Sequence, residues 1–189
     1  MCIRDRVYPV MKGAAEFFLD TLVEDPRDKC LVTCPSTSPE RPNPTGTGLC
    51  AGSTMDMGIL RDLFDNCIKA SGILGVDADF RAKLQDARNR LAPLKIGKHG
   101  QIQEWRDDWD INEHDNHVSH LYNLFPSCQI TPTATPQLAD AARVSLRMRG
   151  DGDSSWGKAW RINLHARLGD GSHAPVSYTH LRAHETEAD

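Results

Sequence analysis

The sequence predicts an all-α fold, and three observations support this prediction. Apolar residues recur at helical spacing, first at Val10, Met11, Ala14, Phe17, Phe18 and Leu22. The alternation of apolar and polar residues that marks strands is sparse. Long polar stretches rich in Pro, Gly, Ser and Thr separate the helical segments. We therefore expect helices joined by irregular loops, with a functional site built by loops on one face.

The N-terminal half predicts three helices. The first covers residues 8–25, and a Pro-rich loop over residues 25–53 excludes helix around "PERPNP". The second covers residues 54–74, with Thr54 as N-cap and Gly75 just past its end. The third covers residues 77–94, with Asp77 as N-cap and a stop near Pro93.

The C-terminal half predicts two longer helices after a mostly irregular stretch over residues 97–130. Within that stretch, a short helix is expected at residues 119–124. The next helix has Thr135 as N-cap, Pro136 at its first position and Gly150 at its end. The last helix covers residues 154–171 and ends at Gly169 or Gly171.

The composition excludes some classes of function and leaves others open. Of 189 residues, 39% are hydrophobic and 25% charged, which is ordinary for one globular domain. A net charge of −4 gives no electrostatic reason to expect a nucleic-acid partner. No apolar run has the length of a membrane span, so no membrane partner is expected. The six cysteines form no CxxC pair. Oligomeric state and localisation stay open, with a secreted or periplasmic parent as one option.

The two ends of the sequence are expected to be artefacts. "MCIRD" at residues 1–5 can be written as the codons ATG TGT ATA AGA GAC, whose reverse complement translates as "VSYTH", the sequence of residues 176–180. Unrelated protein segments have no reason to share this relation, which is typical of translated sequencing-adapter repeats. We expect residues 1–6 and 176–189 to derive from an adapter and to lie outside the packed core. The native domain then covers residues 7–175.

A cluster of histidines at residues 114–120 raises the question of a metal. His114, His117 and His120 are spaced at three, which would place them on one face if the segment were helical. "HDNHVSH" does not match the H-E-x-x-H template of zinc proteases, although a three-histidine site stays possible in principle. The alternative is a polar loop whose histidines bond backbone carbonyls. We expect no metal.

Tryptophans in polar surroundings favour a carbohydrate ligand. Sugar sites combine aromatic platforms with charged and amide side chains. All four tryptophans lie in or beside polar segments, close to several glutamine, acidic and histidine side chains: Trp105, Trp109, Trp156 and Trp160. The competing interpretation places each tryptophan in the core between helices.

Two carboxylates are candidates for hydrolytic chemistry. Glycoside hydrolysis uses one carboxyl group as an acid and another to activate water or attack the sugar. Glu40 lies among prolines on a rigid, non-helical loop, a suitable place for a fixed acid. Asp170 lies at the C-terminal end of the last helix, where the helix dipole disfavours a carboxylate. A solvated surface aspartate is the alternative for Asp170.

Six ordered motifs resemble glycoside hydrolase family 95 across residues 7–174. They read "YPVMKGAAEFFLDTL", "CPSTSPE", "TMDMGILRDLFDNCI", "GQIQEW", "NHVSHLYNLFP" and "WGKAWRINLHARLGDGSHA". The resemblance implies part of an (α/α)₆ barrel, an inverting mechanism without a cofactor or metal, and an oligosaccharide or polysaccharide substrate. The best-known activity in this family is that of α-L-fucosidases on terminal α-1,2-linked fucose.

The resemblance also implies roles for individual residues. Glu40 of "SPE" would be the general acid and Asp170 of "ARLGDG" would help to activate water, with the two carboxylates approaching each other near His117. His117 would contact the sugar, and Glu104 of "QEW" is the second choice for the acid. The full set expected to bind substrate is His117, His120, Glu104, Trp105, Trp156 and Trp160.

Three positions depart from the family pattern. Arg41 stands where Asn usually follows the acid, Asn116 stands where Arg usually precedes the first histidine of "HVSH", and His165 often corresponds to Trp. An upstream asparagine pair that holds the water in the family is not found here. Two alternatives therefore stay open: a family member that cleaves α-galactosides, and a non-catalytic, sugar-binding helical fragment.

Overall fold

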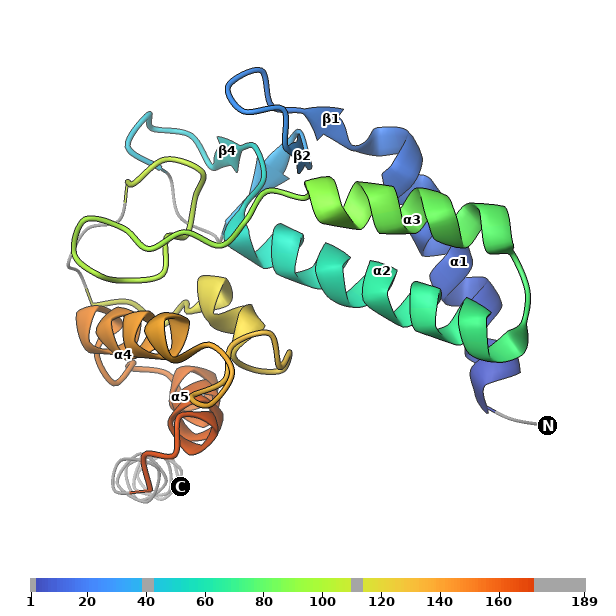
Figure 1. The fold of residues 1–189 in the computed structure, drawn as a ribbon. Coiled ribbons are helices and arrows are strands. Elements are labelled where there is room, and N and C mark those ends of the chain that lie inside the picture. The colour runs from blue at the N-terminus through green and yellow to red at the C-terminus, as the bar shows by residue number, and fades with distance from the viewer. Residues whose placement is uncertain (1–2, 39–42, 110–113, 172–189) are drawn as a thin grey trace.

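The computed structural model describes residues 3–38, 43–109 and 114–171, with side chains from Arg6 onward. Helices dominate the described residues (Figure 1), so the all-α prediction is confirmed. In chain order the elements are α1 (Ile3–Thr21), β1 (Val23–Glu24), β2 (Leu31–Val32), β3 (Ser36–Thr37), β4 (Leu49–Cys50), α2 (Thr54–Leu74), α3 (Ala78–Arg90), the 3₁₀ helix η1 (Ser119–Asn123), α4 (Pro136–Arg149) and α5 (Ser155–Arg167).

The first helix differs from its prediction at both ends. It already includes the backbone of residues 3–7, and it stops at Thr21 rather than continuing to Asp25. It stops there because Val23 pairs with Val32 in the antiparallel pair β1–β2, which draws the chain into an extended form. Arg6 is exposed, and the origin of residues 1–6 stays a prediction.

The N-cap of α2 is Ser53, so the prediction of Thr54 was wrong by one residue. The Ser53 hydroxyl accepts a hydrogen bond from the Asp56 backbone N–H at 3.3 Å. The Thr54 hydroxyl instead donates to the Gln103 carbonyl at 2.6 Å, a tertiary contact that local sequence does not reveal. At the other end Gly75 adopts φ 68°, as expected of a residue that closes a helix in the left-handed region.

Helix α3 begins after Asp77, as predicted, but the Asp77 side chain does not cap the helix. Its carboxylate accepts a hydrogen bond from the Tyr8 hydroxyl at 2.8 Å and lies 2.9 Å from Lys12 Nζ. Asp77 therefore ties the start of α3 to α1. Helices α1, α2 and α3 enclose one apolar cluster, which consists of Ala15, Val32, Met57, Leu60, Phe64, Cys67, Leu84, Ala87, Leu91 and Ala92.

A second apolar cluster holds the C-terminal half together. It lies between η1, α4 and α5 and includes Leu121, Leu124, Ile130, Ala142, Leu146 and Leu164. Helix α4 follows Thr135, starts with Pro136 and ends before Gly150, as predicted. Helix α5 is capped by the Ser154 hydroxyl, which accepts from the Gly157 N–H at 3.1 Å, and it ends at Arg167.

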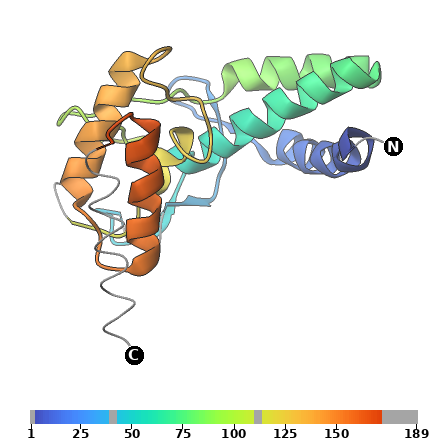
Figure 2. The ribbon, with the colours of Figure 1, turned by 90° about the horizontal axis from the view of Figure 1, so that it is seen from below.

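The two halves meet where the start of α2 packs against η1 (Figures 1 and 2). A methyl group added at Gly58 would lie 2.4 Å from Asn123 Oδ1, so the close approach of α2 to η1 requires glycine there. One turn further along α2, Asp62 accepts hydrogen bonds from Tyr122, Ser127 and Gln129. Within the described residues, no helix is long and apolar enough to cross a membrane.

Candidate functional site

A cavity of about 140 Å³ opens at the junction between the two halves. Its wall is almost entirely apolar and comes from the start of α2, the segment entering η1 and the first turns of α5. The lining residues are Met55, His117, Val118, Ser119, Tyr122, Trp156 and Trp160. The structure thus brings together three of the residues predicted to bind substrate, namely His117, Trp156 and Trp160.

The two tryptophans of the cavity lie one turn apart on the same face of α5. The indole of Trp156 faces the His117 imidazole, with ring centroids 5.2 Å apart. Trp160 packs edge-on against Phe125, with centroids 5.5 Å apart. Both indoles keep a large exposed surface, 47% and 37% respectively. They are therefore not buried in the core of this chain.

His117 is held by the segment that precedes it. Its backbone N–H donates to Asp115 Oδ1 at 2.6 Å, and its ring Nδ1 lies 2.9 Å from the same oxygen. Arg161 is 1% exposed, and its guanidinium donates to the carbonyls of Asp115 and Asn116. Burial lowers the pKa of Arg161 from its ordinary value. The buried guanidinium of Arg161 thus holds the loop that carries His117 in place.

Glu104 lies behind the cavity wall rather than in it. Its carboxylate is 1% exposed; Oε2 lies 2.6 Å from Arg149 Nη2, and Oε1 accepts from the Ser38 hydroxyl at 3.2 Å. The Ser38 and Ser119 hydroxyls are 3.3 Å apart, and Ser119 lines the cavity. The hydroxyls of Ser38 and Ser119 therefore connect the Glu104 carboxylate to the cavity wall. This position does not support the predicted direct contact of Glu104 with substrate.

His120 is buried in the same layer and does not line the cavity. Its Nδ1 lies 3.8 Å from Glu104 Oε2 and has no hydrogen-bond partner among the described residues. Burial, with a further contribution from the Arg149 charge, lowers the pKa of His120 to about 3. The imidazole is therefore neutral in the folded protein, and the structure gives a substrate no access to it.

Trp105 is also placed away from the cavity. It is 7% exposed, and its ring packs against Trp109 with centroids 6.2 Å apart. The following residue, Arg106, forms an ion pair with Asp25 at 3.2 Å. Hydrogen bonds to Asp25, chiefly from Arg27, hold the pKa of this aspartate well below its usual range. Trp105 thus belongs to a structural loop, as the competing core interpretation expects.

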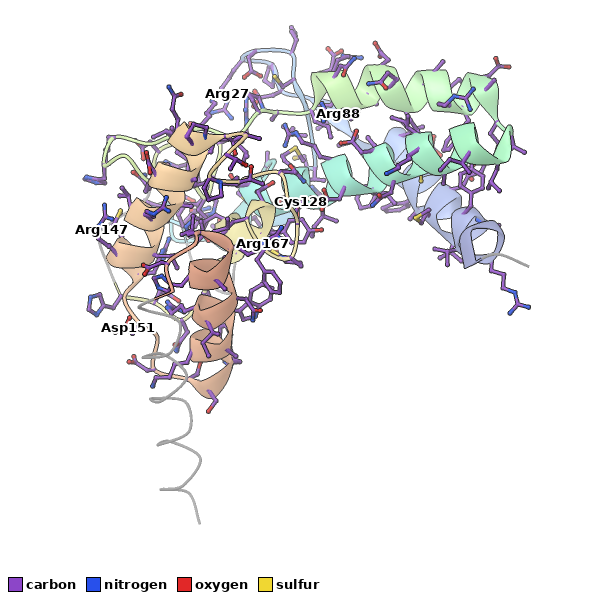
Figure 3. The ribbon with its side chains drawn as sticks, turned by 60° about the horizontal axis from the view of Figure 1, so that its bottom comes forward. Arg27, Arg88, Cys128, Arg147, Asp151 and Arg167 are labelled. Carbon is purple, nitrogen blue, oxygen red and sulfur yellow. The ribbon has the colours of Figure 1, made fainter. Side chains whose placement is uncertain are left out.

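Asp170 lies on the other side of α5 from the cavity. It borders a groove of about 420 Å³ together with His165, Arg143 and Arg147, and its carboxylate is 3.4 Å from His165 Nδ1. His165 follows Trp156 by nine positions, about 2.5 helical turns, so the two side chains face opposite directions. Figure 3 shows Arg147 and Asp151 of this groove on one side of α5. Arg167, on the Trp156 face, lies on the other side.

This placement leaves one expectation open. Asp170 borders the groove and His117 lines the cavity, on opposite faces of α5. The sequence does not reveal this arrangement, because both residues belong to motifs that are predicted to form a single site. The predicted approach of Asp170 to Glu40 near His117 stays a prediction, because Glu40 lies outside the described residues. The role of Asp170 in activating water stays a prediction.

Glu40 lies outside the described residues, but the chain leading to it is well anchored. The hydroxyls of Thr33 and Ser36 both donate to Asp56 Oδ2, at 2.8 and 2.7 Å. Ser38, two positions before Glu40 in the sequence, is 2% exposed and bonds Glu104. The described part of the "SPE" motif therefore ends at Ser38, the serine that connects Glu104 to the cavity wall.

The three clustered histidines do not converge on a metal site. His114 borders the groove near Asp170, His117 lines the cavity, and His120 is buried beside Glu104. The segment is irregular up to η1, so the spacing of three does not place them on one face. In the part of the chain that is described, no group of three or more His, Cys, Asp or Glu could hold a metal ion.

Several residues of the site escaped prediction. Met55 and Tyr122 line the cavity, Asp115 and Arg161 fix the loop of His117, and Arg149 neutralises Glu104. Tyr122 lies in the quoted motif "NHVSHLYNLFP", Met55 in "TMDMGILRDLFDNCI" and Arg161 in "WGKAWRINLHARLGDGSHA", so these motifs were the available signal. Asp115 and Arg149 lie outside the quoted motifs, and no local pattern marks them.

Comparison with protein families gives one match that covers nearly the whole chain. The model of the glycosyl hydrolase family 95 catalytic domain matches residues 1–188. The match extends over both ends that were expected to be adapter-derived, and that expectation stays a prediction.

Two curated relatives are similar over most of this chain. Alpha-L-fucosidase 2 of Arabidopsis thaliana is 37% identical over 95% of the chain. Probable alpha-fucosidase A of Aspergillus niger is 35% identical over 87% of the chain. The chain spans about 22% of the length of each relative.

Proposed function

The chain belongs to glycosyl hydrolase family 95, and on that premise we propose that it forms part of the catalytic barrel of an inverting α-L-fucosidase that cleaves terminal α-1,2-linked fucose. The catalytic domain of the family is an (α/α)₆ barrel, and the five α-helices described here are consistent with part of one. The names of both relatives support a fucoside as the substrate.

The observation that carries the proposal is the apolar, aromatic cavity at His117, Trp156 and Trp160. A pyranose presents a face of C–H groups that packs well on indole rings. Fucose is a 6-deoxy sugar, so its C6 is a methyl group that loses no hydrogen bonds to water in an apolar wall. The hydroxymethyl group of a galactoside would have to be desolvated there, which costs free energy unless a partner replaces the water. The cavity therefore favours fucose over galactose.

Glu40 is our proposed general acid. Its loop starts from Ser38, which connects the cavity wall to Glu104. Glu104 is the weaker candidate because its carboxylate is buried and ion-paired with Arg149, and such a pair stabilises the ionised form, which has no proton to donate. In an inverting enzyme the acid and the group that activates water lie roughly 6.5–9.5 Å apart. We leave that second group unassigned.

The experiment compares two substrates on the full-length parent enzyme. An α-1,2-linked L-fucosyl disaccharide and the matched α-L-galactosyl disaccharide differ only by the hydroxyl at C6. We expect kcat/KM to be higher for the fucoside by roughly 10- to 10²-fold, the range that one buried hydroxyl produces in an apolar pocket. Equal rates would favour the galactoside alternative. Sugar binding without release of either monosaccharide would favour the non-catalytic alternative.

A further inference from the structure

Asp115 makes a two-point contact with His117. Its Oδ1 accepts the His117 backbone N–H at 2.6 Å and lies 2.9 Å from ring Nδ1. An ionised carboxylate has only acceptor sites, so the proton between the two side chains lies on Nδ1. In a neutral imidazole this makes the other ring nitrogen, Nε2, a hydrogen-bond acceptor.

Asp115 is itself held in place. Its side chain is 10% exposed, and Oδ2 lies 3.9 Å from Arg149 Nη1. Its backbone N–H donates to the Arg149 carbonyl at 3.0 Å, and its own carbonyl accepts from Arg161 Nη2 at 2.5 Å. The aspartate is thus fixed at its backbone and at its carboxylate, whereas His117 is 29% exposed at the cavity wall.

We propose that Asp115 is the positioning residue of the cavity: it fixes the Nδ1–H tautomer and the ring direction of His117, so that Nε2 accepts a hydrogen bond from a hydroxyl of the bound sugar. The choice of a sugar as donor rests on the proposed function, whereas the tautomer does not. Arg149 extends the arrangement, since it lies between the carboxylates of Asp115 and Glu104.

The tautomer is tested on the chain itself by nitrogen-15 NMR of labelled histidine at pH 8, with His117→Gln used to assign its signals. We expect the Nδ1–H tautomer in the wild-type chain and in Asp115→Asn, whose amide oxygen still accepts. In Asp115→Ala we expect the Nε2–H tautomer, which water favours for free imidazole. A wild-type chain in the Nε2–H form, or an Asp115→Ala chain that keeps Nδ1–H, would overturn the proposal.

The consequence for the sugar is tested on the full-length parent with the fucosyl disaccharide. Losing one oriented hydrogen bond should raise KM about tenfold in Asp115→Ala, with a smaller change in kcat, and Asp115→Asn should recover most of the loss. Equal losses in both variants would show that charge rather than positioning matters, and would contradict the proposal. A parent that hydrolyses no fucoside would refute the proposed function but leave the tautomer result standing.

Discussion

The imidazole of His117 and the indole of Trp156 face each other at 5.2 Å, with their planes inclined by 59°. One ring comes from the irregular segment before η1 and the other from the first turn of α5. Two motifs that are far apart in the sequence thus meet in one aromatic wall.

Removing that wall should weaken substrate binding. In the parent, Trp156→Ala is expected to raise KM for the fucosyl disaccharide at least ~10-fold, because the sugar loses its packing surface. Trp156→Phe keeps an aromatic face and should lose less. The matched control is Trp109→Ala, which removes an indole that packs on Trp105 away from the cavity. If Trp109→Ala raised KM as much as Trp156→Ala, the cavity would not be the sugar site.

Breaking the buried pair between Arg149 and Glu104 should destabilise the fold. Arg149→Met leaves a carboxylate that is 1% exposed without its cation, and such losses cost about 3–5 kcal/mol. Urea unfolding of the chain measures the change. Arg147→Met, two positions earlier on the exposed face of α4, should stay within about 0.5 kcal/mol. The double variant Arg149→Met, Glu104→Gln should be more stable than the sum of the single losses predicts; strict additivity would argue against the pair.

His120 predicts how stability depends on pH. Burial lowers its pKa to about 3 in the folded chain, whereas an unfolded histidine has a pKa near 6.5. Between these pH values only the unfolded state takes up the proton. The contribution of neutral His120 to the free energy of unfolding is therefore complete above pH 6.5 and is lost as the pH falls towards 3. From pH 7 to pH 4.5 the free energy of unfolding of the wild-type chain should fall by about 2 kcal/mol more than that of His120→Gln. Parallel losses in urea titrations would mean that His120 is not buried as a neutral ring.

Asp170→Asn tests the predicted role of Asp170 in activating water, which expects the activity of the parent to fall by ~10²-fold or more. Asp170 borders the groove on the far face of α5, beside His165, and does not line the aromatic cavity. The measurement is kcat on the fucosyl disaccharide. A kcat within about twofold of wild type would contradict that role and would agree with the place of Asp170 on the far face of α5.

Most of the fold could be predicted because the helical signals are local. The periodicity of α2, the Pro136 start of α4 and the closing glycines Gly75 and Gly150 lie within single segments. The errors arose where tertiary contacts decide. Ser53 rather than Thr54 caps α2, because the Thr54 hydroxyl donates to the Gln103 carbonyl. Helix α1 ends earlier than predicted because Val23 pairs with Val32.

The site was less predictable for the same reason. His117, Trp156 and Trp160, which the sequence predicts to bind substrate, line one cavity in the structure. The motifs could not show that His120, Glu104 and Trp105 are buried behind it or away from it. They also could not reveal that Asp170 lies on the opposite face of α5, since that depends on how α5 is rotated against its neighbours. The contacts of Asp115 and Arg149 emerge only in the folded chain.

The most direct test of the account is the rate of the Glu40→Gln parent on two fucosides with different leaving groups. Gln keeps the size and hydrogen bonding of Glu but has no proton to transfer. We predict a fall of at least ~10²-fold on the natural disaccharide and a clearly smaller fall on an aryl fucoside with a good leaving group, which needs little protonation. Full activity on the disaccharide would contradict the account, and Glu104 would then be the acid to test.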